Sequence, residues 1–288
     1  MTIDRVGFIG LGAMGSRMAT NLVAGGFDLV GFDAAGTGAR LPAGAAEASS
    51  AKHVGEAADV VLLSLPDGAA SAAVAGELLE SRPRRVRVVV DTSTIGVTAA
   101  RHISARLREA GLEYVDAPVS GGIAGAANAT IALMFSGSAD ELERLRPVLG
   151  VISKRCFHVG QEPGQGQAMK LLNNYLSAVA LAATSEAVSF GLTQGLDMKG
   201  MLDVLNASSG QNTATSDKFP NRIVPGLYDA QFRNTLMLKD LTLYGENVAV
   251  AGTAGDVSRA VLETWRRFAT AEPDADFTRI FPFVRDKR

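Results

Sequence analysis

Short apolar runs alternate with longer helical patterns through the first half of the chain. Five runs have the length and composition of strands, at residues 5–9, 29–32, 60–63, 86–90 and 113–115. The stretches between them are long enough for crossover helices, which is the rhythm of βαβ units. The pattern predicts an α/β fold with a doubly wound, mainly parallel sheet covered by helices on both faces.

Two further apolar runs, at residues 130–135 and 156–159, flank a charged helical pattern at 140–148 and are expected to extend this sheet. The first domain is therefore predicted to span residues 1–163. The uninterrupted apolar stretch that follows predicts one long buried helix at about 167–191, which would join this domain to a second one.

The remainder of the chain shows only helical patterns. Helices are expected at residues 198–205, 236–251 and 256–271, with loops at 208–215 and 220–229. Residues 164–288 are therefore predicted to form an all-α C-terminal domain, with the long linking helix as its first element.

Composition agrees with two globular domains and names no macromolecular partner. The chain has 288 residues, 47% of them hydrophobic and 20% charged. Lys plus Arg number 28 against 30 for Asp plus Glu, so no strong global field would attract nucleic acid or an anionic membrane. A basic cluster at residues 82–87 is expected to be a solvated loop.

Cysteine and histidine usage limits the possible chemistry. Cys156 is the only cysteine, which excludes an intramolecular disulfide and leaves a thiolate metal cage without ligands. Its place in an apolar run indicates a packed side chain. The three histidines are scattered without metal-ligand spacing, so we expect no metal site. A cytoplasmic protein without a membrane span is predicted.

The first strand leads into a glycine-rich turn and then a helix. Gly10 would allow the tight turn, Gly12 would leave room for a pyrophosphate, and Gly15 would let helix and strand pack closely. Leu11, Ala13 and Met14 complete the motif. Phosphates bind such helix N-termini through unpaired N–H groups and the helix dipole, so the segment predicts a Rossmann-type dinucleotide site.

Asp33 follows the second strand, where a carboxylate can bind the adenine-ribose hydroxyls and repel a 2′-phosphate. This favours NAD over NADP, with Arg40 as the one nearby cation that could receive such a phosphate. Asp33 could alternatively cap a turn.

Lys170 and Asn174 are four residues apart at the start of the long helix, so both should project from one face. Apolar neighbours and a helix N-terminus both disfavour the charged form of Lys170, which suits a general acid or base. A snorkelling lysine at a helix end is the structural alternative.

Four segments in order give the chain a resemblance to a known family. They are the glycine motif at residues 7–15, Asp116-Ala117-Pro118-Val119-Ser120-Gly121-Gly122, residues 164–174, and Lys239-Asp240-Leu241. Together they resemble the β-hydroxyacid dehydrogenases, the family of 3-hydroxyisobutyrate dehydrogenase and tartronate semialdehyde reductase. The resemblance spans nearly the whole chain.

The resemblance implies a role for each matched residue. Lys170 would donate and accept the proton, Asn174 would orient the substrate, and Ser120, Gly121 and Gly122 would bind it. A serine hydroxyl and glycine N–H groups can hold a carboxylate. Leu65, Pro66 and Thr94 would line the cofactor, and Lys239, Asp240 and Phe232 would lie near the site. Phe232 could equally be core. A homodimer or homotetramer is also implied.

Together these signals predict an NAD-dependent oxidoreductase that interconverts a small β-hydroxy acid and its semialdehyde or keto form. The chain departs from the family at two positions: Ala129 stands where a Gly is frequent, and Gln211 where an Arg is frequent. Without this arginine, the chain lacks a cation that could bind a second anionic group of a substrate. A glyoxylate or succinic semialdehyde reductase, an imine reductase and a non-catalytic dinucleotide-binding scaffold remain as alternatives.

Overall fold

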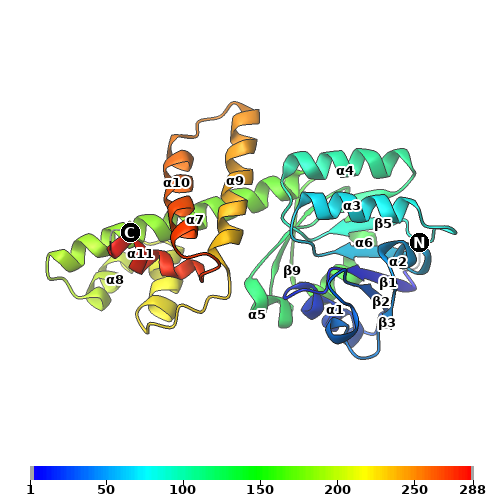
Figure 1. Cartoon of the computed structure of the whole chain (residues 1–288), viewed down its shortest axis with the longest axis horizontal. Helices are drawn as coiled ribbons and strands as arrows, with labels where there is room; N and C mark the ends of the chain where they lie inside the picture. Colours follow the sequence, from blue (N-terminus) through cyan, green and yellow to red (C-terminus); the bar gives the residue numbers. More distant parts are fainter. Residues whose placement is uncertain (1–2, 287–288) are drawn as a thin grey trace. The chain divides into compact units, whose positions relative to one another are not determined.

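The computed structural model describes residues 3–286 (Figure 1). The chain divides into two compact units, Met1–Lys170 and Leu171–Arg288. The dividing point falls within helix α7, which runs from Gln165 to Thr193.

The N-terminal unit is built on one nine-stranded sheet. Its strands are β1 (Arg5–Ile9), β2 (Asp28–Phe32), β3 (Ala46–Glu47), β4 (Val60–Leu63), β5 (Val88–Asp91), β6 (Glu113–Asp116), β7 (Val119–Ser120), β8 (Ala132–Ser136) and β9 (Arg155–Gly160). They are ordered β3-β2-β1-β4-β5-β6-β8-β7, with β9 also paired to β8. The predicted strands are confirmed, whereas β3 and β7, two residues each, carried too little pattern to be predicted.

Most strand pairs are parallel, as expected. Only β8 runs antiparallel to its neighbours β6 and β7 within the described sheet. Because β1 lies between β2 and β4, the strand order reverses there, and such a switch point is where doubly wound sheets bind ligands beyond the carboxyl ends of their strands.

Helices cover both faces of this sheet, and each face has its own hydrophobic core. On one face lie α1 (Gly15–Ala24), α5 (Gly122–Ala127) and α6 (Ala139–Ile152), packed on alternate strand residues such as Phe8 and Leu62. On the other lie α2 (Ala51–Ala57), α3 (Gly68–Leu79) and α4 (Val97–Glu109), packed on residues such as Ile9 and Val61. Figure 1 shows α3 and α4 side by side over their face. Both faces are buried, which explains the continuous apolar runs of β4 and β5.

The C-terminal unit is helical, as predicted. Besides α7 it contains α8 (Met198–Asn206), α9 (Asn234–Ala251), α10 (Asp256–Ala271) and α11 (Ile280–Arg285). Its core gathers aromatic side chains, among them Trp265, Phe268 and Phe281. The expected loops at 208–215 and 220–229 are wrong in part, because a π-helix spans Ala214–Ile223 and contains Pro220.

The long helix expected at about residues 167–191 is present as α7, but the expectation that it is buried is confirmed only in part. Leu172, Leu176 and Phe190 expose 44%, 57% and 68% of their surface. Ala178, Leu181 and Val188 on the same helix are buried in the core of the C-terminal unit. Length and composition would also let α7 cross a membrane, but the core helix of a soluble protein passes the same test. Apolar composition alone did not reveal which faces of the helix are covered.

Candidate functional site

The glycine turn has a different steric reason for each of its glycines. Gly10 has φ +91°, and an added Cβ would lie 2.3 Å from the Ser64 carbonyl oxygen. A Cβ on Gly15 would lie 1.9 Å from the Gly10 oxygen, so the turn can close onto α1 only without a side chain there. A Cβ on Gly12 would meet nothing within 4 Å. Gly12 therefore leaves open space at the start of a helix, as a bound pyrophosphate requires.

Asp33 ties the end of β2 to this turn. Its Oδ2 accepts a hydrogen bond from the Leu11 N–H at 2.7 Å, and its Oδ1 accepts one from the Ala35 N–H at 2.8 Å. Arg40 donates to Oδ1 through Nη1 at 3.0 Å. The turn-capping interpretation of Asp33 thus has a structural basis. It is compatible with a ribose-binding role, because a carboxylate has about four acceptor sites.

The loops after β4 and β5 are joined to each other. The Leu65 N–H donates to Ser93 Oγ at 2.8 Å, and the Thr92 N–H donates to the Leu63 carbonyl oxygen at 2.9 Å. Pro66 and Thr94 are the next residues of these loops. Since β4 and β5 are neighbouring parallel strands, both loops lie at the carboxyl edge of the sheet, on the same edge as the glycine turn.

Ser120, Gly121 and Gly122 form the passage from β7 into α5. Ser120 pairs with Ala132 in the sheet, while Gly121 and Gly122 have φ of +138° and +65°. Both glycines are exposed on the N-terminal unit. Ala129, beyond α5, has φ +53°, a conformation that favours glycine and explains why glycine would suit this position.

Two buried aspartates end β5 and β6 and are register partners across these strands. Asp91 accepts from the Ser93 N–H at 2.9 Å, and Asp116 accepts from Ser136 Oγ at 2.5 Å and the Gly164 N–H at 2.9 Å. Burial raises the pKa of Asp91, and the charge of Asp116 raises it further, against hydrogen bonds from Ser93. Burial likewise raises the pKa of Asp116, against the hydrogen bonds from Ser136 and Gly164.

Asp116 anchors the first turn of α7. Its Oδ2 accepts from the Gln167 N–H at 2.9 Å, so the carboxylate receives N–H groups at both ends of the Gly164–Gln167 segment. A Cβ on Gly166 would lie 2.6 Å from the Met134 carbonyl oxygen. This close approach to the sheet fixes the start of α7. Lys170 follows one turn later and is 8% exposed.

The matched residues of the C-terminal unit form a second polar group. Asn174 Nδ2 donates to Asp240 Oδ2 at 2.6 Å, and Lys239 Nζ lies 3.3 Å from Asp240 Oδ1. Asn174 and Asp240 are both buried. Phe232 packs edge-on against Phe277, with ring centroids 5.6 Å apart, at the margin of the aromatic core. Phe232 thus has a structural contact of its own, in accordance with the core interpretation.

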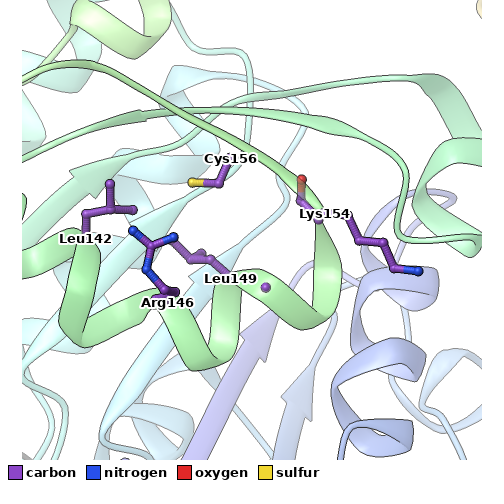
Figure 2. Close-up of a pocket in the computed structure, with 7 residues that line it drawn as sticks. Leu142, Arg146, Leu149, Lys154 and Cys156 are labelled. Atoms are coloured by element: carbon purple, nitrogen blue, oxygen red, sulfur yellow. The ribbon is translucent and has the colours of Figure 1, made fainter.

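A pocket of about 340 Å³ lies elsewhere on the N-terminal unit, between α6 and β9 (Figure 2). Leu142, Arg146, Leu149, Lys154 and Cys156 are among its lining residues, and none of the predicted site residues belongs to it. Partial burial raises the pKa of the Cys156 thiol, and the side chain packs against the core as expected. The pocket therefore adds nothing to the candidate site.

Sequence reasoning overlooked the buried polar residues Asp91 and Gln167, and it assigned no role to Asp116. Their hydrogen-bond partners lie as far as 74 residues away in the sequence. The only available signals were a charged residue at the end of an apolar strand and a glutamine at the beginning of an apolar helix.

Known protein families match both parts of the chain. Residues 5–160 match the NAD-binding domain of 6-phosphogluconate dehydrogenase, and residues 164–284 match the NAD-binding domain of NADP-dependent 3-hydroxyisobutyrate dehydrogenase. An NAD-dependent L-serine dehydrogenase of Pseudomonas aeruginosa is 37% identical, over 92% of each chain. A 2-(hydroxymethyl)glutarate dehydrogenase of Eubacterium barkeri is 36% identical, over 88% of this chain and 84% of that one.

Among solved structures, the 3-hydroxyisobutyrate dehydrogenase of Mycobacterium tuberculosis, described with L-serine, matches with a TM-score of 0.90. It is 33% identical, and the match covers 99% of this chain and 100% of that one. Both family matches and these relatives lead to one conclusion: the chain belongs to the β-hydroxyacid dehydrogenase family of NAD(P)-dependent oxidoreductases.

Proposed function

We propose that the protein uses NAD to interconvert a small β-hydroxy acid and its semialdehyde or keto form, with Lys170 as general acid and base. The observation that carries the proposal is the grouping of parts within the N-terminal unit. The glycine turn, the loops after β4 and β5, and the carboxylate that anchors the helix of Lys170 all lie along the carboxyl edge of one sheet.

The cofactor would be held by Gly10, Leu11, Gly12, Ala13, Met14 and Gly15, with Asp33 at the ribose and Leu65, Pro66 and Thr94 along its length. Gly12 leaves the space that the pyrophosphate needs, and the N-terminus of α1 favours its charge. When bound, the nicotinamide supplies hydride acceptance and donation.

The substrate carboxylate would be held at Ser120, Gly121 and Gly122, through a hydroxyl and main-chain N–H groups. The positive φ of both glycines turns successive N–H groups in directions that residues with side chains rarely reach. Asn174, one helical turn beyond Lys170 on α7, would orient the substrate, and its amide is itself held by Asp240. Lys239 would complete the site.

Lys170 would move the proton that accompanies the hydride. In oxidation, its neutral amine takes the proton of the substrate hydroxyl, and the hydride leaves the carbon that carries this hydroxyl. In reduction, its ammonium returns the proton to the carbonyl oxygen. Its 8% exposure limits exchange with bulk water. General acid–base catalysis of this kind contributes about 10²–10⁴ in rate.

The substrate class follows from what the named relatives act on. L-Serine, 3-hydroxyisobutyrate and 2-(hydroxymethyl)glutarate share one skeleton, a CH₂OH group on the carbon that carries the carboxylate. We therefore infer a substrate of the form HOCH₂–CHR–COO⁻. Gln211 brings no second cation, so a monocarboxylate is favoured over a dicarboxylate.

A substrate panel tests the proposal. The wild-type protein is given NAD or NADP with L-serine, 3-hydroxyisobutyrate or 2-(hydroxymethyl)glutarate, and reduced cofactor is followed by absorbance. Isobutanol is the matched control, because it has the skeleton of 3-hydroxyisobutyrate without the carboxylate. We expect turnover with at least one hydroxy acid and none with isobutanol.

Two outcomes would replace the proposal. Oxidation of NADH only with glyoxylate or succinic semialdehyde would make the protein a reductase of another acid class. NADH binding without turnover on any of these compounds would favour the non-catalytic scaffold.

We also propose a cytoplasmic homodimer or homotetramer. Leu172, Leu176 and Phe190 on α7 expose apolar surface that self-association would cover. Sedimentation velocity on the wild-type protein and on Leu176→Lys tests this, since a charge on that surface is expected to shift the assembly toward monomer. A wild-type monomer would contradict it.

A further inference from the structure

The side chain of Gln167 is enclosed within the N-terminal unit and none of its surface is exposed. It lies on the first turn of α7, three residues before Lys170. A carboxamide offers two donors and an acceptor with two lone pairs, and burying it without partners would cost free energy. Its hydrogen bonds therefore show what this side chain does.

The Gln167 carboxamide makes three hydrogen bonds to the loop after β5. Its Oε1 accepts from the Ile95 N–H at 2.9 Å and from the Gly96 N–H at 3.2 Å. Its Nε2 donates to the Ser93 carbonyl oxygen at 2.9 Å. These three bonds bracket Thr94, the residue that the proposed function places along the cofactor.

The backbone of Gln167 is held from a different strand. Its N–H donates to Asp116 Oδ2, while Ser93, the partner of the side chain, accepts from the Leu65 N–H through its hydroxyl. Gln167 is thus the point at which the start of α7, the end of β6 and the loop after β5 meet. Both of its attachments are buried, so water cannot readily replace them.

We propose that Gln167 is a positioning residue, whose buried carboxamide holds the Ser93–Gly96 segment, and Thr94 within it, against the helix that carries Lys170. The assignment rests on the proposed function, because Thr94 and Lys170 have their roles only there. A displacement of about 1 Å between a cofactor-lining residue and a proton donor can cost about a hundredfold in rate. Gln167 therefore acts through these two residues and need not contact the substrate.

Gln167→Met tests the assignment, since methionine keeps the length of the side chain and removes all three hydrogen bonds. Gln165→Met is the matched control: the same substitution two residues earlier, where the side chain is exposed and accepts from the Glu162 N–H. Amide hydrogen exchange of the cofactor-free protein is measured first. We expect peptides that cover residues 93–96 to exchange at least tenfold faster in Gln167→Met only.

Steady-state kinetics on the best substrate of the panel and NADH titrations provide the second readout. In Gln167→Met we expect kcat to fall about tenfold to a hundredfold. KM and the NADH dissociation constant should change less than about threefold, because the parts that hold the substrate carboxylate and the pyrophosphate are untouched. In Gln165→Met all three should stay within twofold of wild type.

Gln167→Glu serves if the methionine variant does not fold. It keeps an acceptor for Ile95 and Gly96 and loses the donor to Ser93. It should therefore show faster exchange at residues 93–96 and a lower kcat than wild type, both by smaller factors than the methionine variant. Wild-type exchange there in both variants overturns the assignment, and so does faster exchange with an unchanged kcat.

The proposed function and the assignment of Gln167 are overturned by different results. If the wild-type protein turns over none of the hydroxy acids, the proposed function fails and the assignment of Gln167 fails with it. If wild type is active and Gln167→Met is equally active, only the assignment of Gln167 is overturned.

Discussion

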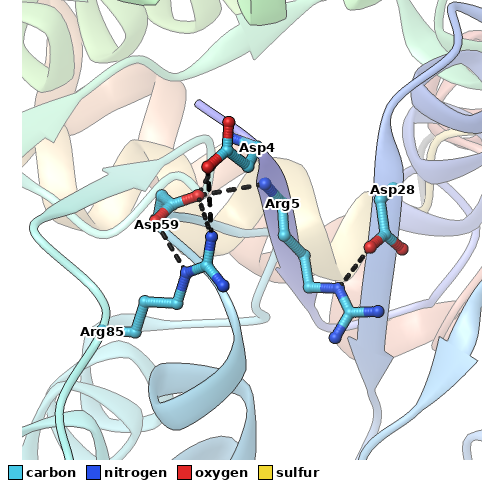
Figure 3. A network of polar contacts seen from close by, with 5 residues as sticks. All are labelled: Asp4, Arg5, Asp28, Asp59 and Arg85. Atoms are coloured by element: carbon cyan, nitrogen blue, oxygen red, sulfur yellow. Dashed lines mark hydrogen bonds and ion pairs between the residues drawn. The ribbon is translucent and has the colours of Figure 1, made fainter. Parts of the chain in front are cut away.

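The two edges of the N-terminal sheet use carboxylates in opposite ways. At the amino edge, Asp59 accepts from Arg85 Nε at 2.8 Å and from the N–H groups of Asp4 and Arg5 at 3.0 Å, and Arg5 pairs with Asp28 (Figure 3). At the carboxyl edge, Asp91 and Asp116 are fully buried and receive hydroxyl and main-chain N–H groups.

This difference also shifts the pKa values of the carboxyl groups at the two edges in opposite directions. Partial burial alone would raise the pKa of Asp59, but the hydrogen bonds from Arg85, Arg5 and Asp4 outweigh it and hold the pKa below its ordinary value. Burial dominates at Asp91 and Asp116 and raises their pKa values. The amino edge is thus an ion network that joins strands. At the carboxyl edge, buried carboxyl groups hold the loops and the helix of the candidate site, although their burial costs free energy.

The largest stability difference between the edges is expected at Asp116. Asp116→Ala leaves three buried donors, from Ser136, Gly164 and Gln167, without their acceptor, and should lower the free energy of unfolding by about 3 kcal/mol. Urea denaturation measures this. Asp140→Ala, an exposed aspartate on α6, is the control and should cost less than about 1 kcal/mol. Equal effects of the two substitutions would remove the anchoring role of Asp116.

The next effect concerns binding at the glycine turn. Gly12→Val fills the space reserved for the pyrophosphate and should weaken NADH binding at least about a hundredfold, equivalent to about 2.7 kcal/mol. Gly150→Val is matched, since a Cβ there also meets nothing within 4 Å, but Gly150 lies on α6 beside the pocket of Figure 2. Fluorescence titration should give wild-type affinity for the control. A wild-type affinity in Gly12→Val would place the cofactor elsewhere.

A smaller effect is expected in the pH dependence of folding stability, which should have opposite signs for the carboxyl groups at the two edges. The pKa of Asp59 is lowered in the folded state, so its contribution is present above the unfolded pKa of about 4 and is lost as pH falls through the folded value. Asp59→Asn should therefore cost about 1–2 kcal/mol at pH 7 and progressively less toward pH 3.

Asp91 has the reverse sign. Its pKa is raised in the folded state, so its stabilising contribution is fully present below about pH 4 and is lost as pH rises through the folded value. The stability of the wild type relative to Asp91→Asn should therefore be greatest in acid. Denaturation of wild type and both variants from pH 3 to 8 checks the two slopes; slopes of the same sign would contradict the comparison.

The smallest effect is expected at Arg40, the cation on Asp33 at the carboxyl edge. Arg40→Ala leaves the Asp33 charge uncompensated, which should repel the 2′-phosphate of NADPH more than it affects NADH. The ratio of the NADPH to the NADH dissociation constant should rise about threefold to tenfold, equivalent to about 1 kcal/mol. An unchanged ratio in paired titrations would show that Arg40 does not influence cofactor choice.

Helices and strands that a local sequence pattern encodes were predicted correctly. Side-chain contacts that depend on the tertiary structure were overlooked. The strand predicted at residues 60–63 coincides with β4, and the helix predicted at 256–271 coincides with α10, because each has an unbroken local signature. The basic cluster at residues 82–87 lies in a loop with Arg82, Arg85 and Arg87 exposed, as expected. The sequence did not reveal that Arg85 is bound to Asp59 and Arg84 to the Ala110 carbonyl oxygen.

The same limit applies to the candidate site. The glycine turn and Lys170 were found because their chemistry lies within short motifs, and the motif around Asp116 was noticed without the reason for its aspartate. That reason is the amino end of α7, 48 to 51 residues further along the chain. Gln167 could not be distinguished from a surface glutamine, since nothing in its neighbours reveals that its carboxamide is enclosed.

The central claim is that Lys170 moves the proton in the oxidation of a β-hydroxy acid, and its most direct test joins turnover and cofactor binding in one variant. Lys170→Met keeps an unbranched side chain without the amine, and Lys154→Met, at an exposed lysine beside the α6–β9 pocket, is its control. The account predicts that kcat falls about a thousandfold in Lys170→Met alone, with NADH affinity within about threefold of wild type. Turnover within tenfold of wild type in a folded, NADH-binding Lys170→Met protein would contradict it.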